Sequence, residues 1–460
     1  MSYSPAKRAQ MCKHTRAECS FLSDAESESG AVGMWRSGRG ALAVLVAALL
    51  LAVAGCGGGG SSSGKTQITV WEGYTDVEGN AFKKLANEFD ASHKGIDVKI
   101  LETNNDYALQ KVLTAVRGGT PPDVAYLYGS WAPNVAKIPS VVDLTSTVKT
   151  KAVNWNDFYS GERAVATVNN KVIGMPALVD NLAIVYNKVL FQKAGVAPPT
   201  PQWTWDDFRS AAQKLTDAAT KQFGTSYPAD ASEDSVWHWE AMLWEAGGQI
   251  LNSDNTKAAF DSPAGLKAMT TLKQMAVDDK SVYVDTTNSK YMDLFNAGKI
   301  GMLVTGPWDL SSVQVPYGVQ IMPAYPGSSA GHQSIAGPDN WVVFNNGSAR
   351  VAAAKTFVTW LTAAPQVKEF SLATGDLPTR ISVGTDPSVI KQMNDKLPGL
   401  KVYIHNLSNV KQARPQVPVY PKISEALGNA IVGVLLGKLS PQDALTQASD
   451  ATNQALSSGS

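Results

Sequence analysis

The chain reads QITVW at residues 67–71, NAFKKLANEFDAS at 80–92, IDVKIL at 96–101, YALQKVLTAVRGG at 107–119 and PDVAYLYG at 122–129. The first run alternates apolar and polar side chains as a strand does, and the second spaces its apolar side chains as one face of a helix. The third and fifth runs are further strand patterns, and the fourth is a helix pattern closed by two glycines. A strand–helix–strand–helix–strand order predicts a parallel sheet flanked by helices.

The same alternation continues to the C-terminus. Residues 174–195 are expected to be a strand that runs into a helix, and residues 204–219 a helix that opens with a capping box between Thr204 and Asp207. Residues 349–375 indicate two helices interrupted at Pro365. The fold class is therefore α/β. About 395 residues follow residue 65, more than one core comfortably holds, so two lobes are expected.

A different pattern precedes the first strand. Residues 41–54 are an uncharged apolar run behind Arg36 and Arg39, as in a secretory signal peptide. The run ends in Val53-Ala54-Gly55-Cys56, which resembles the lipobox of bacterial lipoproteins. That resemblance implies a lipid on Cys56; a secreted protein with a stray cysteine is the alternative. We assign residues 34–55 to the signal peptide and residues 56–65 to a Gly/Ser tether. Residues 1–33 are either a mis-annotated start upstream of Met34 or a disordered extension.

Residues 59–66, GGSSSGKT, also match the phosphate-loop pattern G-x-x-x-x-G-K-[ST]. Such a loop needs a buried strand before it and a helix after it, so that backbone N–H groups converge on phosphate. Here a signal-peptide pattern comes before and a strand pattern after. We interpret the match as accidental.

Composition excludes several function classes. The three cysteines are Cys12, Cys19 and Cys56, so the folded part has no disulfide, thiol nucleophile or cysteine metal site. Six of the 40 basic and four of the 40 acidic side chains precede residue 56, which leaves a net charge of about −2. That balance gives no reason to expect nucleic acid as a partner. The five histidines are scattered, and no metal or cofactor is expected.

Six phrases carry a resemblance to a known family. They are GGTPPDVAYLYG, VIGMPALVDNLAIVYNKVLFQKAG, TWDDFRSAAQKL, FNAGKIGMLVTGPWDL, AAKTFVTWLTAAPQVKEF and TGDLPTR. In this order they resemble the bacterial extracellular solute-binding proteins of the maltose-binding kind, which are receptors of ABC importers. The resemblance covers about residues 66–456. It implies a type II periplasmic-binding fold, in which two lobes, each a mainly parallel sheet flanked by helices, enclose a solute in a cleft.

Carried onto this sequence, the family's organisation assigns each lobe two segments. Lobe 1 would hold residues 66–178 and 334–376, and lobe 2 residues 181–330 and 380–456. Hinge crossings would fall near residues 178–180, 329–333 and 376–379.

A sugar-binding cleft needs aromatic platforms for C–H faces and carboxylates or amides for hydroxyl groups. The resemblance implies Asp180 as a cleft carboxylate, with Asn181 beside it, and Trp308 and Trp237 as stacking residues. Packing roles are the alternative for both tryptophans, and a solvated loop for Asp180. Three more candidates, Tyr74, Tyr128 and Trp131, follow strand ends, where open α/β sheets bind ligands. Trp341 and Arg414 complete the predicted set.

We predict a lipid-anchored, monomeric receptor on the outer face of the cell membrane that delivers a mono- or oligosaccharide to a permease. The first loop, WEGYTDVEG, lacks the adjacent acid and lysine of the maltose receptor, so maltose itself is not expected. Arg414 would suit a phosphate, which makes a glycerophosphodiester or polyol phosphate the alternative ligand.

The sequence disfavours two other function classes. An exported glycosidase would use paired carboxylates, but Asp206-Asp207 and Asp278-Asp279 fall on helical or loop surfaces by pattern. Residues 327–331, GSSAG, match G-x-S-x-G in polar coil, where no strand feeds a helix. Metal capture would want clustered ligands, and His238 lies between tryptophans as a packed side chain does. No catalysis is expected.

Overall fold

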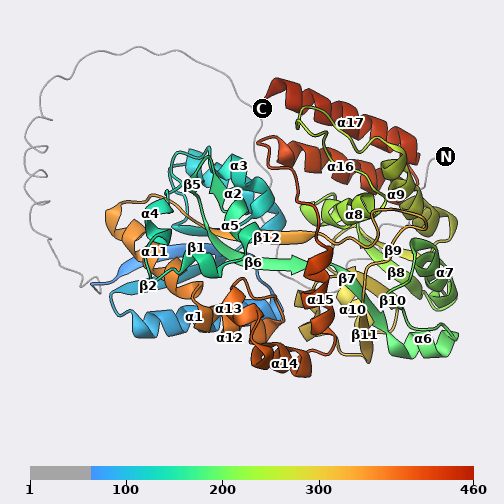
Figure 1. Cartoon of the computed structure of the whole chain (residues 1–460), viewed down its shortest axis with the longest axis horizontal. Coiled ribbons are helices and arrows are strands. Elements are labelled where there is room, and N and C mark those ends of the chain that lie inside the picture. Colours follow the sequence, from blue (N-terminus) through green and yellow to red (C-terminus); the bar gives the residue numbers. More distant parts are fainter. Residues whose placement is uncertain (1–63, 460) are drawn as a thin grey trace, which may run out of the picture. The chain divides into compact units, whose positions relative to one another are not determined.

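The computed structural model describes residues 64–459. The predictions that concern the signal peptide, Cys56 and the segment before Met34 lie outside the described residues. Within them, the α/β class is confirmed: two five-stranded sheets are each flanked by helices (Figure 1).

The first sheet has the order β2-β1-β3-β12-β6. Its strands are β1 (Thr66–Glu72), β2 (Ile96–Glu102), β3 (Val124–Tyr128), β6 (Met175–Asn181) and β12 (Ala336–Val343). β1 pairs in parallel with β2 and with β3, which confirms the arrangement predicted from residues 67–129. β12 runs antiparallel to both of its neighbours, so the sheet is mixed.

Helices cover both faces of this sheet. α1 (Asp76–Ser92) buries Phe82, Leu85 and Phe89 in one core, which it shares with α11 (Ser348–Leu361). α2 (Ala108–Arg117) packs in a second cluster with Ala125 and Leu127 of β3. The alternation along β3 sends neighbouring side chains to opposite faces, so one strand serves both cores.

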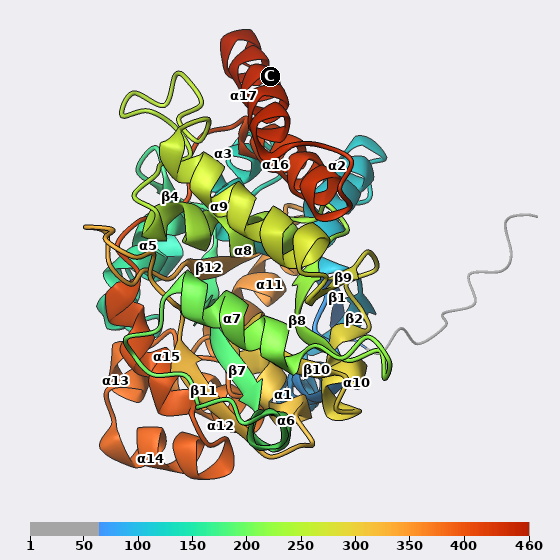
Figure 2. The same ribbon diagram turned by 90° about the vertical axis from the view of Figure 1, so that its right-hand side faces the viewer.

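The second sheet has the order β11-β7-β10-β8-β9. Its strands are β7 (Ala183–Asn187), β8 (Phe223–Pro228), β9 (Val282–Asp285), β10 (Ile300–Thr305) and β11 (Tyr317–Ile321). β8 pairs in parallel with β9 and β10, whereas β7 runs antiparallel to β10 and β11. α7 (Trp205–Leu215) lies in front of these strands in Figure 2, and α9 (Pro263–Lys273) lies above it, where it packs on α8. The capping box of α7 is confirmed: the Thr204 side chain accepts from Asp207 N, and the Asp207 side chain accepts from Thr204 N.

Further helices surround the sheets. They are α3 (Ala132–Val135), α4 (Thr145–Val148), α5 (Ser160–Val165), α6 (Lys188–Ala194), α8 (Glu233–Glu245), α10 (Tyr291–Asn296), α12 (Ala364–Thr374), α13 (Ile381–Gly384), α14 (Pro387–Lys396), α15 (Leu400–Asn406), α16 (Tyr420–Leu435) and α17 (Pro441–Ser458). A short hairpin joins β4 (Thr167–Val168) to β5 (Lys171–Val172). α12 begins one residue before Pro365, as expected for the break between two helices. No helix of residues 64–459 is long and apolar enough to cross a membrane.

The single strand expected at the start of residues 174–195 is wrong in detail, because the chain changes sheets within it. β6 ends at Asn181 in the first sheet and β7 begins at Ala183 in the second, so Leu182 is the residue between them. Both strands are almost wholly buried, and a continuous apolar run carries no mark of such a change. Beside this point Val179 forms a bridge with Leu377, where a second segment passes the first sheet.

Candidate functional site

The two sheets approach each other where β12 faces α8. A Cβ placed on Gly337 of β12 would lie 3.4 Å from the Trp237 ring and 3.8 Å from Nη2 of Arg414. Trp237 belongs to α8, and Arg414 to the segment between α15 and α16. Residues predicted separately from the sequence therefore meet at one place, which we call the interlobe site.

Trp237 and Trp308 form the aromatic part of this site. Their ring centroids lie 5.8 Å apart with the planes inclined by 32°. Trp308 lies on the 3₁₀ turn η6 (Pro307–Ser312), and a Cβ on Gly306 would come within 1.8 Å of its ring, so glycine there allows this ring position. Trp237 is 7% exposed, and its Nε1 has no hydrogen-bond partner within the described residues. The pair offers apolar ring surface and a free donor.

Arg414 lies beside this pair and is already neutralised. Its Nη1 donates to Oε1 of Glu233 over 2.8 Å, and the Tyr420 hydroxyl donates to the same oxygen over 2.9 Å. Ser130, on the 3₁₀ turn η3 (Gly129–Trp131) that follows β3, donates to it over 3.4 Å. Glu233 thus connects the first sheet's side of the site to α8 and α16.

Tyr128 brings a further carboxylate to the site. Its hydroxyl donates to Oδ1 of Asp106 over 3.1 Å, and its ring lies 4.6 Å from that of Trp131. Trp131 itself is buried in the core behind β3. Burial raises the pKa of Asp106 to about 8, and the carboxylates of Asp234 and Asp230 add to the effect. Because those two groups precede or begin α8, carboxylates face each other across the site.

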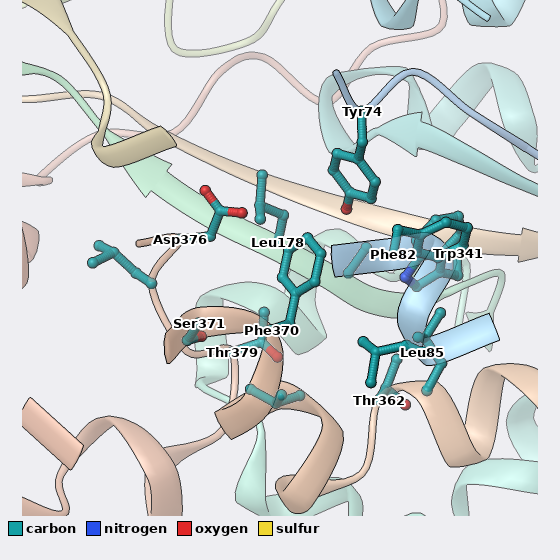
Figure 3. Close-up of a pocket in the computed structure, with 14 residues that line it drawn as sticks. Tyr74, Phe82, Leu85, Leu178, Trp341, Thr362, Phe370, Ser371, Asp376 and Thr379 are labelled. Carbon is teal, nitrogen blue, oxygen red and sulfur yellow. The ribbon is translucent and has the colours of Figure 1, made fainter. Parts of the chain in front are cut away.

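Tyr74 and Trp341 lie deeper, in the core of the first sheet. The Trp341 ring stacks on Phe82 at 5.2 Å, and the Tyr74 ring lies 6.1 Å from Trp341. Both line a cavity of about 30 Å³ together with Phe370 and Asp376. Figure 3 shows Asp376 at one end of this cavity and Trp341 at the other, with Tyr74 and Phe370 between them.

Asp180 and Asn181 lie where the chain leaves the first sheet. Asp180 is 2% exposed; its Oδ1 accepts from Leu377 N over 3.1 Å, and its Oδ2 has no partner within residues 64–459. The Asn181 amide is fully used: Nδ2 donates to Tyr403 O over 3.0 Å, and Oδ1 accepts from Asn406 over 2.9 Å. Asn181 therefore ties α15 to the crossing, and Asp180 keeps a free oxygen.

Glu78, Asp309 and Asp376 complete the site but were not predicted. Burial raises the pKa of Asp376 to about 6 and holds that of Glu78 well above its usual range, with the neighbouring carboxyls adding to the effect on Glu78. The pKa of Asp180 is raised in the same way, by burial first and Asp376 second. Burial also raises the pKa of Asp309 to about 6. Isolated acids in polar runs such as TDVEG read as solvated surface, so the sequence contained no signal that Glu78, Asp309 and Asp376 join Asp180.

His238, considered for metal capture, is held within the protein. Nδ1 lies 2.8 Å from Asp234 O and 3.2 Å from Oδ1 of Asp234, and Nε2 lies 2.9 Å from Val304 O. Burial alone would lower the pKa of His238, but Asp234 and these contacts raise it to about 8. Among residues 64–459 no three His, Cys, Asp or Glu side chains are placed to hold a metal ion.

Known proteins share this arrangement. The family model for bacterial extracellular solute-binding proteins matches residues 73–368, more than half of the chain. The chain belongs to this family. The resemblance predicted from the six phrases is thereby confirmed, together with its α/β fold.

Individual relatives align with this chain over most of their length. A putative binding protein of Brucella abortus is 25% identical over 401 residues, 84% of this chain and 92% of the relative. The sn-glycerol-3-phosphate-binding periplasmic protein of Pectobacterium atrosepticum is 21% identical over 417 residues, 85% of this chain and 91% of that protein. An ABC substrate-binding protein of Listeria monocytogenes, solved with cycloalternan, is 26% identical with a TM-score of 0.77, covering 85% of this chain and 99% of that one.

Proposed function

We propose that this protein is a receptor that binds a mono- or oligosaccharide at the interlobe site and delivers it to the permease of an ABC importer. The observation that carries the proposal is the Trp237–Trp308 pair beside carboxylates with unpartnered oxygens. The sugar named for the Listeria structure supports the ligand class. The ligand of the Pectobacterium relative supports the alternative, a polyol phosphate.

The site suits the two surfaces of a sugar. The apolar C–H face of a pyranose would lie on the indole rings, which offer large apolar area. Its hydroxyls would exchange hydrogen bonds with carboxyl groups such as that of Asp180, whose Oδ2 has no partner within the described residues. The free Nε1–H of Trp237 would donate to a ring or hydroxyl oxygen. A ligand held from both sheets at once would stabilise the closed arrangement that a permease recognises.

The phosphate alternative is less favoured because of Arg414. Its guanidinium is paired with Glu233 at 2.8 Å, and the negative charges of Glu240 and Asp339 also stabilise its positive charge. An anionic ligand would have to replace a buried carboxylate that three other donors also bind, namely Tyr420, Ser424 and Ser130. Removing one partner of such a buried pair is costly, whereas a neutral sugar leaves the pair intact.

A receptor also fits better than a glycosidase. Asp207 caps α7 from within, and Asp279 is paired with Arg209 at 2.5 Å, so two of the four carboxylates considered for catalysis have structural partners. We extend the proposal to the remaining expectations from the sequence. The receptor is monomeric, is exported, and is held at the outer face of the membrane by a lipid on Cys56, with the Gly/Ser segment as its tether.

The test is a melting scan of the purified protein against sugars, glycerophosphodiesters and polyol phosphates. A ligand at 100 times its Kd adds about 2.7 kcal/mol to the free energy of unfolding, which raises the midpoint by a few degrees. We expect a shift with one group of sugars and a parallel change in tryptophan fluorescence. A shift with phosphodiesters alone would transfer the proposal to the alternative. Hydrolysis of a glycoside by the pure protein would overturn the receptor.

A further inference from the structure

Glu78, Asp180 and Asp376 bring three carboxyl groups together from separate parts of the chain. Glu78 lies in the first turn of α1, Asp180 near the end of β6, and Asp376 on the segment after α12. The carboxyl neighbours of Asp376 are Glu78 and Asp180. We call these three side chains the hinge carboxylates.

Two of the hinge carboxylates, Asp180 and Asp376, are buried with oxygens that lack a well-formed hydrogen bond within the described residues. Asp376 is 1% exposed, and within the described residues no well-formed hydrogen bond reaches either of its carboxylate oxygens; only the Thr374 hydroxyl and the carboxyl groups of Glu78 and Asp180 lie close enough to act as donors. The nearby Thr374 hydroxyl donates to Phe370 O instead, and accepts from Asp376 N. One oxygen of Asp180 is also without a partner. Buried carboxylates are expected to be paired, so these oxygens indicate a missing positive or donating group.

Within the described residues, the charges that act most strongly on Glu78 and Asp180 all have the same sign. Those acting on Glu78 belong to Asp376, Asp180 and Asp309. Those acting on Asp180 belong to Asp376, Asp339 and Glu162. The other titratable neighbours from adjacent elements are the phenols of Tyr74 and Tyr403. Neutral hydroxyl groups can donate hydrogen bonds here, but they cannot balance the negative charge that appears when these carboxyl groups lose their protons.

The cavity beside Asp376 has both the room and the walls for a cation. Its volume of about 30 Å³ holds a group of the size of a water molecule or an ammonium. Tyr74 and Phe370, whose ring centroids lie 5.4 Å apart, line it. Ammonium groups are attracted to aromatic faces next to carboxylates. An unpartnered carboxylate aimed into an aromatic cavity is therefore a second indication of the same ligand chemistry.

We propose that the ligand is a saccharide with a protonated amino group, and that this group lies among Glu78, Asp180 and Asp376. The inference rests on the proposed function, because it specifies the ligand of the same interlobe site. Asp309 links the hinge carboxylates to the tryptophan pair. Its negative charge repels that of Glu78, and it follows Trp308 directly in the chain. The sugar ring would stack on Trp308 while its ammonium replaces the protons that the hinge carboxylates otherwise hold.

The experiment compares sugars that differ at one substituent. Calorimetry at pH 7 would measure binding of glucosamine, glucose and N-acetylglucosamine, as monosaccharides and as β-1,4-linked dimers, with the galactose and mannose series alongside. We expect at least one amino sugar to bind about tenfold tighter or more than both its hydroxyl and its acetylated counterparts. If in every series that binds the neutral sugar binds as tightly as its amino counterpart, or more tightly, the inference is overturned and the saccharide receptor stands. If no sugar of the panel binds, the result would contradict both the amino-sugar inference and the proposed saccharide receptor.

Two variants locate the preference. Asp376→Asn and Glu78→Gln should each weaken amino-sugar binding about a hundredfold, because one partner of a buried charge pair is lost. The matched control is Glu245→Gln, another buried carboxylate with an unpartnered oxygen, which accepts from Trp205 in the core of the second sheet. It should leave the amine preference unchanged. Because both cluster variants remove like-charge repulsion, their ligand-free midpoints at pH 8 should equal or exceed that of the parent protein, which separates lost binding from lost folding. An amine preference that survives Asp376→Asn would overturn the proposal.

Discussion

The two ends of the interlobe site differ in how their buried carboxylates are compensated. At one end Glu233 binds Arg414 and accepts from Tyr420 and Ser424, so a cation and hydroxyl donors match the charge. At the other end, Asp376 lies beside the carboxyl groups of Glu78 and Asp180 and the Thr374 hydroxyl, and it forms no ion pair within the described residues. The first end is complete without a ligand, and the second is not. The ligand's chemistry should therefore be decided at the hinge carboxylates, and closure of the lobes should be supported at Arg414.

The largest effect is expected from removing the cation at the matched end. Arg414→Met would leave Glu233 buried without its partner and should lower the free energy of unfolding by about 3–5 kcal/mol. Urea denaturation would measure this loss. Lys391→Met, which breaks an exposed pair with Asp395, should change stability by less than about 0.5 kcal/mol and serves as control. Equal losses in the two variants would contradict the difference between buried and exposed pairs.

Next in size is the loss of ligand binding between the two ends. Trp308→Ala should weaken sugar binding about a hundredfold, because a buried aromatic contact at the centre of an interface is removed. Asp180→Ala should do the same through its free carboxylate oxygen. Calorimetry would measure both. Trp360→Ala removes a tryptophan that packs on Phe89 at 5.5 Å in the first core, and should lower stability with unchanged affinity. Normal binding by both site variants would show that the assignment of the site is wrong.

The hinge carboxylates should also leave a signature in the pH dependence of stability. The folded-state pKa of Asp376, about 6, is raised above its unfolded value near 3.8. Its contribution is therefore fully present below about pH 4 and is lost as the pH rises through 6. In the parent protein this loss lowers the free energy of unfolding by about 1–3 kcal/mol between pH 4 and pH 6. The Asp376→Asn variant should not show it.

Urea unfolding of the ligand-free protein and the variant at pH 4, 5, 6 and 7 would measure this difference. Asp234 provides the opposite sign, because hydrogen bonds and His238 lower its pKa despite burial. Its stabilisation is lost as the pH falls, in parent and variant alike, so the difference between the two isolates Asp376. A difference that does not change with pH would contradict the raised pKa.

The sequence predicted those parts of the site in which a side chain's role follows from the local pattern of residues. The strands and helices of residues 66–128 were predictable, because apolar spacing and capping act over a few residues. Trp237 and Trp308 were named from the family resemblance, and the structure brings them together. Trp341 follows the same kind of reasoning but stacks on Phe82 in the core. The residues next to a tryptophan in the sequence do not determine whether its ring packs in the core or lies in the site.

The hinge carboxylates show the opposite limit. Glu78, Asp180 and Asp376 are separated by about 100 and about 200 residues, and only the crossings between the sheets bring them together. The same holds for the change of sheets at Leu182. The residues on both sides form one continuous apolar pattern, so the sequence gives no sign of the change. Local rules predict elements; the charges that gather where segments cross depend on tertiary structure alone.

The smallest effect is expected from the glycine at the matched end. A Cβ on Gly337 would make ordinary van der Waals contact, 3.4 Å, with Trp237, so Gly337→Ala should change ligand affinity by less than about threefold. Gly129→Ala is the informative counterpart, because its Cβ would lie 2.0 Å from Pro338 O and must displace backbone. That variant should lose about 2 kcal/mol or more of stability. If Gly337→Ala instead abolished binding, the ligand itself would have to pass between β12 and Trp237, and the sugar would lie toward Arg414 rather than toward the hinge carboxylates.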